Sequence, residues 1–321
     1  MQVLPEDTSP SDTATRQGDV QWLTDDDVQV LFAGLAEHPA DWDPGRDTGR
    51  WSLAGAQSKV ALFRGPDGRW GVPADSTPTT HILKPSIPGL RHHHLNEHLC
   101  LRAARLAGLP AAETEIITTG DLEILISRRY DRAQADGRWV RLHQEDLCQA
   151  LAVHPSMKYQ SDGGPGVADI AGLLRGLAGP DRLASTRRFF DALVFNVLIG
   201  ATDAHAKNYS LLLGAASRAQ LGPLYDVATV LPYGERYGHR SAMKIGDAWE
   251  LDQVTRKDWT QVATKLGIPA EEARSRIATL RDAVPEAFHR AAAEPAVPEQ
   301  LQRPAEQLAG LVASHVDGRR R

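Results

Sequence analysis

The spacing of apolar residues changes along the chain and predicts different structures in its two halves. From about residue 51 to residue 130 the apolar residues fall in short, β-rich runs: KVALFR, WGVPA, HILKP, TEIITT and EILISRRY. Such runs bounded by turn residues are typical of strands, and GPDGR between the first two predicts a hairpin. One predicted helix, LNEHLCLRAARLAGL, interrupts the strands, with leucines recurring on one face.

Helical periodicity dominates from about Arg141 onward. It predicts helices over QEDLCQALAV, GVADIAGLLRGLA, DRLASTRRFFDALVFNVLIG, RKDWTQVATKLG, PAEEARSRIATLRDAVPEAFHRAAAE and PEQLQRPAEQLAGLVASHV. The third segment is apolar nearly all round, so we expect it to lie in a core. Near the start of the chain, Thr24 precedes three aspartates and predicts the N-cap of a short helix that runs to Leu35.

These patterns predict an α+β protein with two lobes. Residues 1–20 are polar and rich in Asp, Ser and Thr, and we expect them to be disordered. A small β-rich N-lobe is expected over residues 21–135 and a larger helical C-lobe over residues 136–321. A chain of 321 residues is long enough to bury two cores of ordinary size.

Composition and charge argue against several classes of function for this protein. The formal net charge of −5 argues against free-standing nucleic-acid binding, which normally needs a basic face. The two cysteines, Cys100 and Cys148, lie in apolar helical patterns and are expected to be buried thiols. No secretory leader is recognisable, and no apolar run approaches the roughly 18 residues that suggest a membrane span. We therefore expect a cytoplasmic protein without a membrane partner.

The segment GATDAHAKNYSLLL, at residues 200–213, follows the most apolar predicted helix and gathers polar side chains. Asp203 and Asn208 stand at the Asp-x-x-x-x-Asn interval that protein kinases use between a catalytic carboxylate and a metal-binding amide. A capped turn is the alternative for this interval alone. His205 and Lys207 between them are candidates for phosphate contacts or for hydrogen bonds within the loop.

Other parts of a phosphoryl-transfer site follow in the order in which a kinase places them. Lys84 ends the run HILK, where burial of an ammonium is costly unless an anion pairs with it. Glu97 on the next predicted helix is a candidate partner, and a solvated lysine and glutamate are the alternative. Asp226, after the predicted strand YSLLLG, is a candidate second Mg²⁺ ligand beside Asn208, or a turn residue.

Two further segments are candidate ligand sites. In WSLAGAQSKVALF, backbone N–H groups around Gly55 are able to approach phosphates. In RHHHLNEH, the adjacent histidines point in different directions and no cysteine completes a zinc shell, so we favour no metal there. These histidines are His92, His93, His94 and His98.

Taken together, these segments resemble the HipA-type serine/threonine kinases of bacterial toxin–antitoxin systems. The resemblance is carried from about residue 50 to 235 by SLAGAQSKVAL, HILKP, NEHLCLRAARLAGL, RYDR, LHQEDLCQAL, KYQSDGGPG, ATDAHAKNYSLLL and LYDV. It implies a two-lobed protein-kinase-like fold that binds ATP and Mg²⁺. It also implies transfer of the ATP γ-phosphate to a Ser or Thr of a host protein, expected to be an aminoacyl-tRNA synthetase.

The resemblance assigns roles to individual positions. By position, Asp203 resembles the catalytic aspartate, Asn208 and Asp226 the metal ligands, and Lys84 the nucleotide-binding lysine. Ser52 lies where family members phosphorylate themselves and switch the enzyme off, although position 54, a second serine in some relatives, is alanine here. The remaining nucleotide-site positions implied are Ala54, Gly55, Ala56, Gln57, Arg128, Tyr130, His205 and Tyr225.

The resemblance also implies partners. A HipB-like helix-turn-helix antitoxin is expected, with DNA contacted only through it. Only about 50 residues precede Ser52, which resembles the short, HipT-like variant whose missing N-terminal subdomain is supplied by a separate small protein. Two alternatives remain open: an inactive kinase-like module in an antitoxin–DNA repressor complex, and a small-molecule phosphotransferase. Against the latter, position 201 is Ala where those enzymes carry a histidine.

Overall fold

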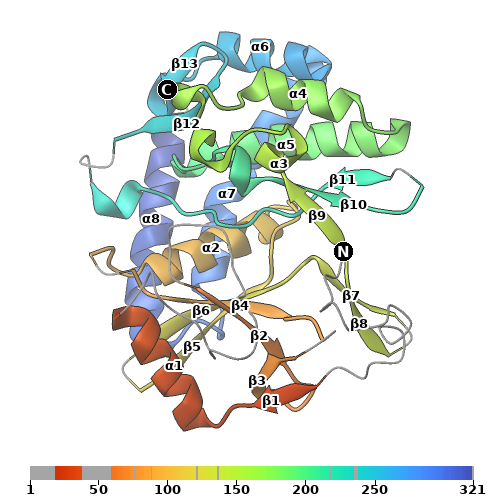
Figure 1. Cartoon of the computed structure of the whole chain (residues 1–321). Helices are drawn as coiled ribbons and strands as arrows, with labels where there is room; N and C mark the ends of the chain where they lie inside the picture. The colour runs from red at the N-terminus through yellow and green to blue at the C-terminus, as the bar shows by residue number, and fades with distance from the viewer. Residues whose placement is uncertain are drawn as a thin grey trace. The chain divides into compact units, whose positions relative to one another are not determined.

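The computed structural model describes residues 19–37, 59–74, 77–87, 89–120, 122–135, 137–216, 218–234 and 238–319. The chain divides into two compact units. The first comprises Met1–Ser86 and Ile117–Arg141, and the second Ile87–Ile116 and Leu142–Arg321. The elements of both units are labelled in Figure 1. The disordered segment predicted at residues 1–20 falls almost wholly outside the described residues.

The first unit is built on a six-stranded sheet in the order β1-β3-β2-β4-β6-β5. The strands are β1 (Val20–Trp22), β2 (Val60–Arg64), β3 (Trp70–Pro73), β4 (His81–Pro85), β5 (Thr114–Thr119) and β6 (Leu122–Arg128). Strands β2 and β3 form the predicted hairpin, with Phe63 opposite Gly71. A second hairpin joins β7 (Arg132–Ala135) to β8 (Arg138–Arg141).

Helix α1 (Asp25–Glu37) packs on this sheet. Its start is fixed as the sequence predicts, because Asp27 accepts hydrogen bonds from the Thr24 amide and hydroxyl at 2.8 and 2.7 Å. Phe32, fully buried, joins β-strand residues such as Leu62 and Leu83 in one apolar cluster. Burial of these side chains stabilises the first unit by the hydrophobic effect.

The second unit is mostly helical. Its helices are α2 (His93–Leu106), α3 (Leu147–Ala150), α4 (Val167–Arg175), α5 (Gly179–Ile199), α6 (Arg256–Leu266), α7 (Ala270–Ala292) and α8 (Gln302–Gly318). Helix α5 contacts α4, α6, α7 and α8, and its Phe189, Phe190 and Phe195 are fully buried, which confirms the predicted core helix. Helix α7 packs against both α2 and α8, as Figure 1 shows.

Short strands complete the second unit. They are β9 (His143–Asp146), β10 (Ser210–Leu213), β11 (Ala219–Leu221), β12 (Arg240–Ile245) and β13 (Ala248–Glu250). The helix predicted over QEDLCQALAV is wrong in its first part, because Gln144 to Asp146 pair with β10 instead. Only the four-residue α3 follows, capped by Asp146. Cross-strand hydrogen bonds therefore override the local helical pattern here.

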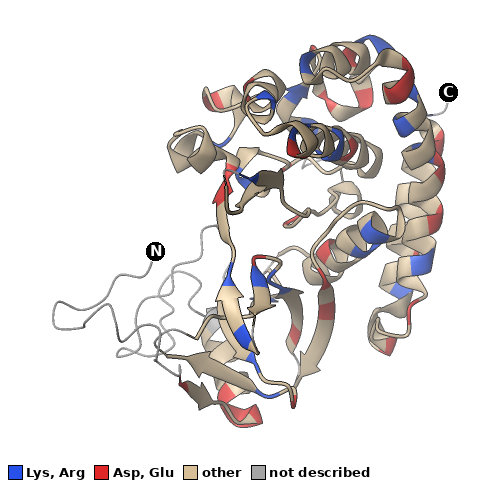
Figure 2. Ribbon diagram, turned by 90° about the vertical axis from the view of Figure 1, so that its right-hand side faces the viewer, with Lys and Arg blue, Asp and Glu red and all other residues tan. Residues whose placement is uncertain are grey.

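Three composition-based expectations bear on the described residues. Cys100 and Cys148 are buried, free thiols, as predicted. Figure 2 shows acidic and basic residues interspersed along the helices of the second unit, in keeping with a formal net charge of −5. Within the described ranges, no helix combines the length and apolarity that crossing a bilayer requires.

Candidate active site

The end of α5 sets the position of the Asp203 loop. The helix ends at Gly200, whose φ of 67° lies in the left-handed region that glycine tolerates. The chain then receives two main-chain hydrogen bonds from distant segments. The Val230 amide donates to the Gly200 carbonyl at 3.1 Å, and the Ala242 amide donates to the Thr202 carbonyl at 2.9 Å. A rigid buried helix and two flanking segments therefore hold the loop.

Within the loop, Asp203 and Asn208 are joined by a compact turn. The His205 amide donates to the Asp203 carbonyl at 2.9 Å, and the Asn208 amide donates to the His205 carbonyl at 2.9 Å. The Asn208 side-chain nitrogen also donates to the Asp203 carbonyl, at 2.8 Å. The Asn208 side chain thus uses its nitrogen within the loop, and its amide oxygen is the atom that the predicted role as a metal ligand would require.

The carboxylate of Asp203 is accessible yet oriented. About 65% of its side chain is exposed, so an incoming hydroxyl can reach it. The Tyr159 hydroxyl donates a hydrogen bond to Asp203 Oδ1 at 2.7 Å. Burial, followed by this hydrogen bond to Asp203, raises the pKa of Tyr159 above its ordinary value, so the tyrosine remains a donor. An exposed carboxylate held in one orientation is suited to receiving a proton.

His205 lies within reach of the charges of two candidate site carboxylates, Asp203 and Asp226. Its side chain is buried, with Nε2 3.9 Å from Asp203 Oδ1 and its ring edge-on to that of Tyr159. Burial lowers the pKa of His205, and the charges of Asp203 and Asp226 oppose this only in part. The imidazole is therefore neutral at pH 7. Its Nδ1 is buried without a hydrogen-bond partner among the described residues, so a bound group would satisfy it.

Asp226 is presented by a strained turn beside this loop. Its φ of 57° is unusual for a residue other than glycine. The preceding Tyr225 donates from its hydroxyl to the Lys207 carbonyl at 2.7 Å. Ser210 is then the donor in the 2.6 Å contact between its hydroxyl and that of Tyr225. Tyr225 thus anchors the Asp226 segment to the turn that carries Asn208.

Lys207, left open by the sequence, has a structural partner. Its ammonium lies 2.6 Å from the carboxylate of Asp146. Asp146 in turn caps α3 through a reciprocal pair of hydrogen bonds with Gln149. This ion pair fastens the catalytic-loop candidate to the β9–α3 junction.

The first unit holds the other described candidates. Lys84 is 5% exposed in β4 and lies opposite Leu125 of β6. Arg128 ends β6, and Tyr130 follows it in a turn fixed by Asp131, whose carboxylate accepts hydrogen bonds from Arg129 and Arg132 at 2.7–2.9 Å. Burial alone would raise the pKa of Asp131, but the hydrogen bond and charge of Arg129 and the charge of Arg132 lower it overall. The nucleotide-binding roles of Lys84, Arg128 and Tyr130 stay predictions.

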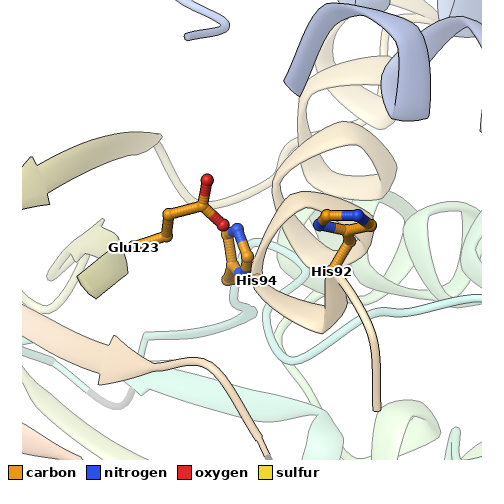
Figure 3. A group of neighbouring side chains, drawn as sticks. All are labelled: His92, His94 and Glu123. Atoms are coloured by element: carbon orange, nitrogen blue, oxygen red, sulfur yellow. The ribbon is translucent and has the colours of Figure 1, made fainter. Parts of the chain in front are cut away.

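Several predicted positions lie outside the described residues. These are Ser52, Ala54, Gly55, Ala56 and Gln57. The histidine cluster is described, and Figure 3 shows His92 and His94 at the start of α2 and Glu123 on β6. The ring centroids of His92 and His94 lie 6.3 Å apart. His93 stacks on Tyr233, and His98 Nδ1 lies 2.9 Å from the Thr114 hydroxyl.

Sequence reasoning missed two residues that organise the site. Tyr159 lies within KYQSDGGPG, whose sequence gives no sign that this hydroxyl orients Asp203. Asn96 on α2 donates to the Thr229 carbonyl at 2.8 Å and accepts from the Thr229 amide at 3.0 Å, three residues after Asp226. The sequence shows Asn96 only as a polar residue in a predicted helix, and the structure buries it to 2% exposure, where its polar groups need partners.

The fold and the loop geometry define an α+β protein of the kinase-like class. Comparison with solved structures agrees. HipA of the Shewanella oneidensis toxin–antitoxin complex with HipB and operator DNA superposes with a TM-score of 0.80 at 23% identity, covering 98% of this chain and 74% of that one. The Helicobacter pylori proinflammatory kinase CtkA superposes with a TM-score of 0.54 at 14% identity, covering 86% of this chain and 91% of that one. Both likenesses concern the fold.

Sequence comparison gives the family. The HipA-like C-terminal domain matches residues 51–288, and the chain belongs to this family. The putative kinase Y4mE of Sinorhizobium fredii is 36% identical over 293 residues, which cover 90% of this chain and 68% of that protein. The serine/threonine-protein kinase toxin HipA of Shewanella oneidensis is 32% identical over 253 residues, which cover 74% of this chain and 57% of that protein. The resemblance recognised in the sequence is thereby confirmed.

Proposed function

We propose that this chain is an ATP-dependent protein serine/threonine kinase. The single observation that carries the proposal is the arrangement around Asp203. Tyr159 orients the exposed carboxylate of Asp203. The main-chain carbonyl of Asp203 accepts a hydrogen bond from the side chain of Asn208, five residues further on. The names of the relatives, a kinase toxin and putative kinases, support the same reaction class.

The donor set fits a magnesium nucleotide. Amide and carboxylate oxygens are ligands that Mg²⁺ accepts alongside phosphate oxygens, and Asn208 and Asp226 offer one of each. The partnerless Nδ1 of His205 is a further polar atom for a bound phosphate or water. Lys84 is the candidate for binding nucleotide phosphates. When bound, ATP supplies the γ-phosphoryl group that is transferred.

The residues of the Asp203 loop bind and orient the hydroxyl that accepts the phosphoryl group. Asp203 would align the hydroxyl of a serine or threonine and take its proton as the hydroxyl oxygen bonds to the γ-phosphorus, while the bond from that phosphorus to the bridging oxygen breaks and ADP leaves. Tyr159 holds the carboxylate in place through Oδ1 and leaves Oδ2 for the acceptor. The neutral His205 places no positive charge beside Asp203, so it does not compete for the carboxylate as an ion-pair partner.

The biological setting follows from the family as a proposal. The chain acts as the toxin of a toxin–antitoxin system, with a HipB-like helix-turn-helix antitoxin as partner and DNA reached through that antitoxin. Support comes from the Shewanella structure, which holds HipA with HipB and operator DNA. The host acceptor is an aminoacyl-tRNA synthetase, and phosphorylation of Ser52 by the chain itself turns the activity off.

Incubation of the purified chain with γ-labelled ATP and Mg²⁺ tests the proposal. Label is expected on Ser52 in the parent protein, and Asp203→Asn is expected to lower the rate about 10²- to 10⁴-fold. Asp25→Asn makes the same chemical change at an exposed carboxylate of α1 and should label like the parent. A parent protein that transfers no label to itself or to host proteins would favour the inactive binding module instead.

The acceptor is identified in a separate experiment. Expression of the parent chain, but not of Asp203→Asn, should arrest growth of the host. Quantitative phosphoproteomics of the two cultures should show one host protein that gains phosphate, and an aminoacyl-tRNA synthetase is expected. Arrest by both proteins would mean that toxicity does not depend on the reaction assigned to Asp203.

A further inference from the structure

A cavity of about 660 Å³ lies within the second unit, away from the Asp203 loop. It is bounded by the start of α2, by the turn around Tyr233 and by the first half of α8, and all of its lining residues belong to that unit. Pockets for small ligands commonly have volumes of about 300–1,000 Å³. The cavity is therefore large enough for an organic molecule, and none of the proposed catalytic residues lines it.

The charged side chains that line the cavity are both basic. Arg91 lies on one side, beside the first turn of α2, and Arg303 lies on α8. Among the residues that line the cavity in the described part of the chain there is no aspartate or glutamate. The Arg91 guanidinium donates to His92 Nε2 at 3.1 Å, which makes this nitrogen an acceptor. Figure 3 shows where His92 lies at the start of α2.

These two arginines differ from others in the same unit. Arg102 pairs with Glu294, Arg187 with Glu272, and Arg276 with Asp191. Neither Arg91 nor Arg303 forms an ion pair with a carboxylate of the described residues. Two guanidinium groups on the wall of one cavity that no carboxylate lines raise the local positive potential, which favours an anion.

The rest of the lining combines apolar side chains with uncharged polar ones. Leu95 and Leu308 are buried, and Leu311 remains 43% exposed at the rim. The Tyr233 ring is held in place because His93 stacks on it and the Asn96 side chain donates to its hydroxyl at 3.2 Å. An apolar wall next to cationic groups fits a ligand with an apolar body and an anionic head.

We infer that this cavity binds a small organic anion, a phosphate or carboxylate carried on an apolar or aromatic body. Arg91 and Arg303 bind the anionic group, and the leucines and Tyr233 contact the body. The site also touches the segment that carries the candidate metal ligand, because Asn96 bonds both Tyr233 and Thr229. The inference concerns binding alone and does not depend on the proposed kinase activity.

Calorimetric titration of the whole chain with three matched probes tests the inference. The probes 1-naphthyl phosphate, 1-naphthoate and 1-naphthalenemethanol share one aromatic body and differ in charge. At least one of the two anions is expected to bind about tenfold more tightly than the neutral alcohol, and the better anion identifies the head group. Equal affinity for all three probes, or no binding of either anion at millimolar concentration, would overturn the inference.

Two charge-reversal variants locate the site. Arg303→Glu on the exposed face of α8 should weaken anion binding about tenfold or more and leave the alcohol unchanged. Arg290→Glu makes the same change on an exposed position of α7 outside the cavity and should bind like the parent. Equal losses in both variants would show a general charge effect, and no loss in Arg303→Glu would place binding elsewhere. Circular dichroism establishes that both variants are folded.

Discussion

The hydroxyl of Tyr159 donates a hydrogen bond to Oδ1 of Asp203 at 2.7 Å, across 44 residues of sequence. Tyr159 also packs its ring against His205 and lies under the ammonium of Lys158, whose Nζ is 4.9 Å from the ring centroid. The tyrosine therefore contacts Asp203, the proposed proton acceptor, and two further polar residues, His205 and Lys158. In the proposed reaction its role is to position Asp203.

Tyr159→Phe should lower the turnover number without unfolding the protein. The change removes one hydrogen bond to a charged acceptor, a contribution of about 1.5–3 kcal/mol, and an effect at the lower end corresponds to about tenfold in rate. The KM for ATP should stay close to that of the parent, because the bond orients the acceptor-side carboxylate. Steady-state kinetics and thermal unfolding measure the two effects. A raised KM for ATP with unchanged turnover would contradict the positioning role.

Asp226 offers a test of backbone strain at the proposed metal site. Its left-handed conformation, with φ of 57°, costs an alanine about 1–2 kcal/mol and costs glycine almost nothing. Asp226→Gly should therefore be more stable than Asp226→Ala by about 1 kcal/mol, after allowance for the greater freedom of glycine in the unfolded chain. Both variants should lose Mg²⁺-dependent phosphoryl transfer, since neither retains the carboxylate.

Denaturant unfolding of the two Asp226 variants supplies the comparison. Because the same carboxylate is deleted in both, its own contacts cancel in the difference. Ala216→Gly is a useful reference, since Ala216 has φ of 54° in an exposed turn and should also be stabilised while the activity is retained. If Asp226→Ala were as stable as Asp226→Gly, the turn would not be strained at this residue.

The sequence was sufficient for elements whose stabilising contacts are local or strongly periodic. Helix α5 was predicted because its apolar residues surround the helix, and the start of α1 because Thr24 and Asp27 cap it within four residues. The catalytic-loop candidate was predicted because Asp203 and Asn208 are close in sequence as well as in space. Each of these features is decided by residues within a few positions of one another.

Features decided by distant partners were not predictable in this way. Strand β9 exists because Gln144 meets Leu212 of β10, and its own letters favour a helix. The role of Tyr159 depends on Asp203, and that of Asn96 depends on Thr229, 133 residues away. A single sequence shows that such residues are polar but does not show which group they meet.

Gly200 gives a prediction about the end of α5. It shares a left-handed conformation with Gly267, the C-cap of α6, at φ of 67° and 70°. A Cβ at Gly200 would lie 3.2 Å from Leu231 Cδ2, whereas a Cβ at Gly267 would have no neighbour within 4 Å. Both Gly→Ala changes should cost about 1–2 kcal/mol for the backbone, and Gly200→Ala should cost more because Leu231 must also shift.

Urea unfolding of the two glycine variants measures this difference. Gly200→Ala should in addition lower the rate of phosphoryl transfer, because Gly200 accepts the hydrogen bond from Val230 that holds the Asp203 loop. Gly267→Ala lies in another helix end and should keep the parental rate. Equal stability losses in the two variants would mean that Leu231 adapts without cost.

The lowered pKa of the buried His98 predicts how the stability of the protein depends on pH. Burial chiefly lowers its pKa to about 4, with the charge of Glu294 opposing the shift and that of Arg102 assisting it. Between the ordinary value of about 6.5 and pH 4, the unfolded chain binds a proton that the folded chain does not. The free energy of unfolding should therefore fall as the pH is lowered through this window. The stability that the neutral, buried His98 contributes should be fully present above about pH 6.5.

His98→Asn isolates the contribution of this histidine, because the amide can still reach the Thr114 hydroxyl that lies 2.9 Å from His98 Nδ1. Urea unfolding at several pH values gives the slope of the unfolding free energy against pH. Removal of one such histidine should reduce that slope by up to about one proton, or about 1.4 kcal/mol per pH unit, between pH 4 and 6.5. A variant that is uniformly less stable, with a slope equal to that of the parent, would show that His98 is already protonated in the folded protein over this range. The buried environment seen around α2 would then be more polar than its packing against α7 implies.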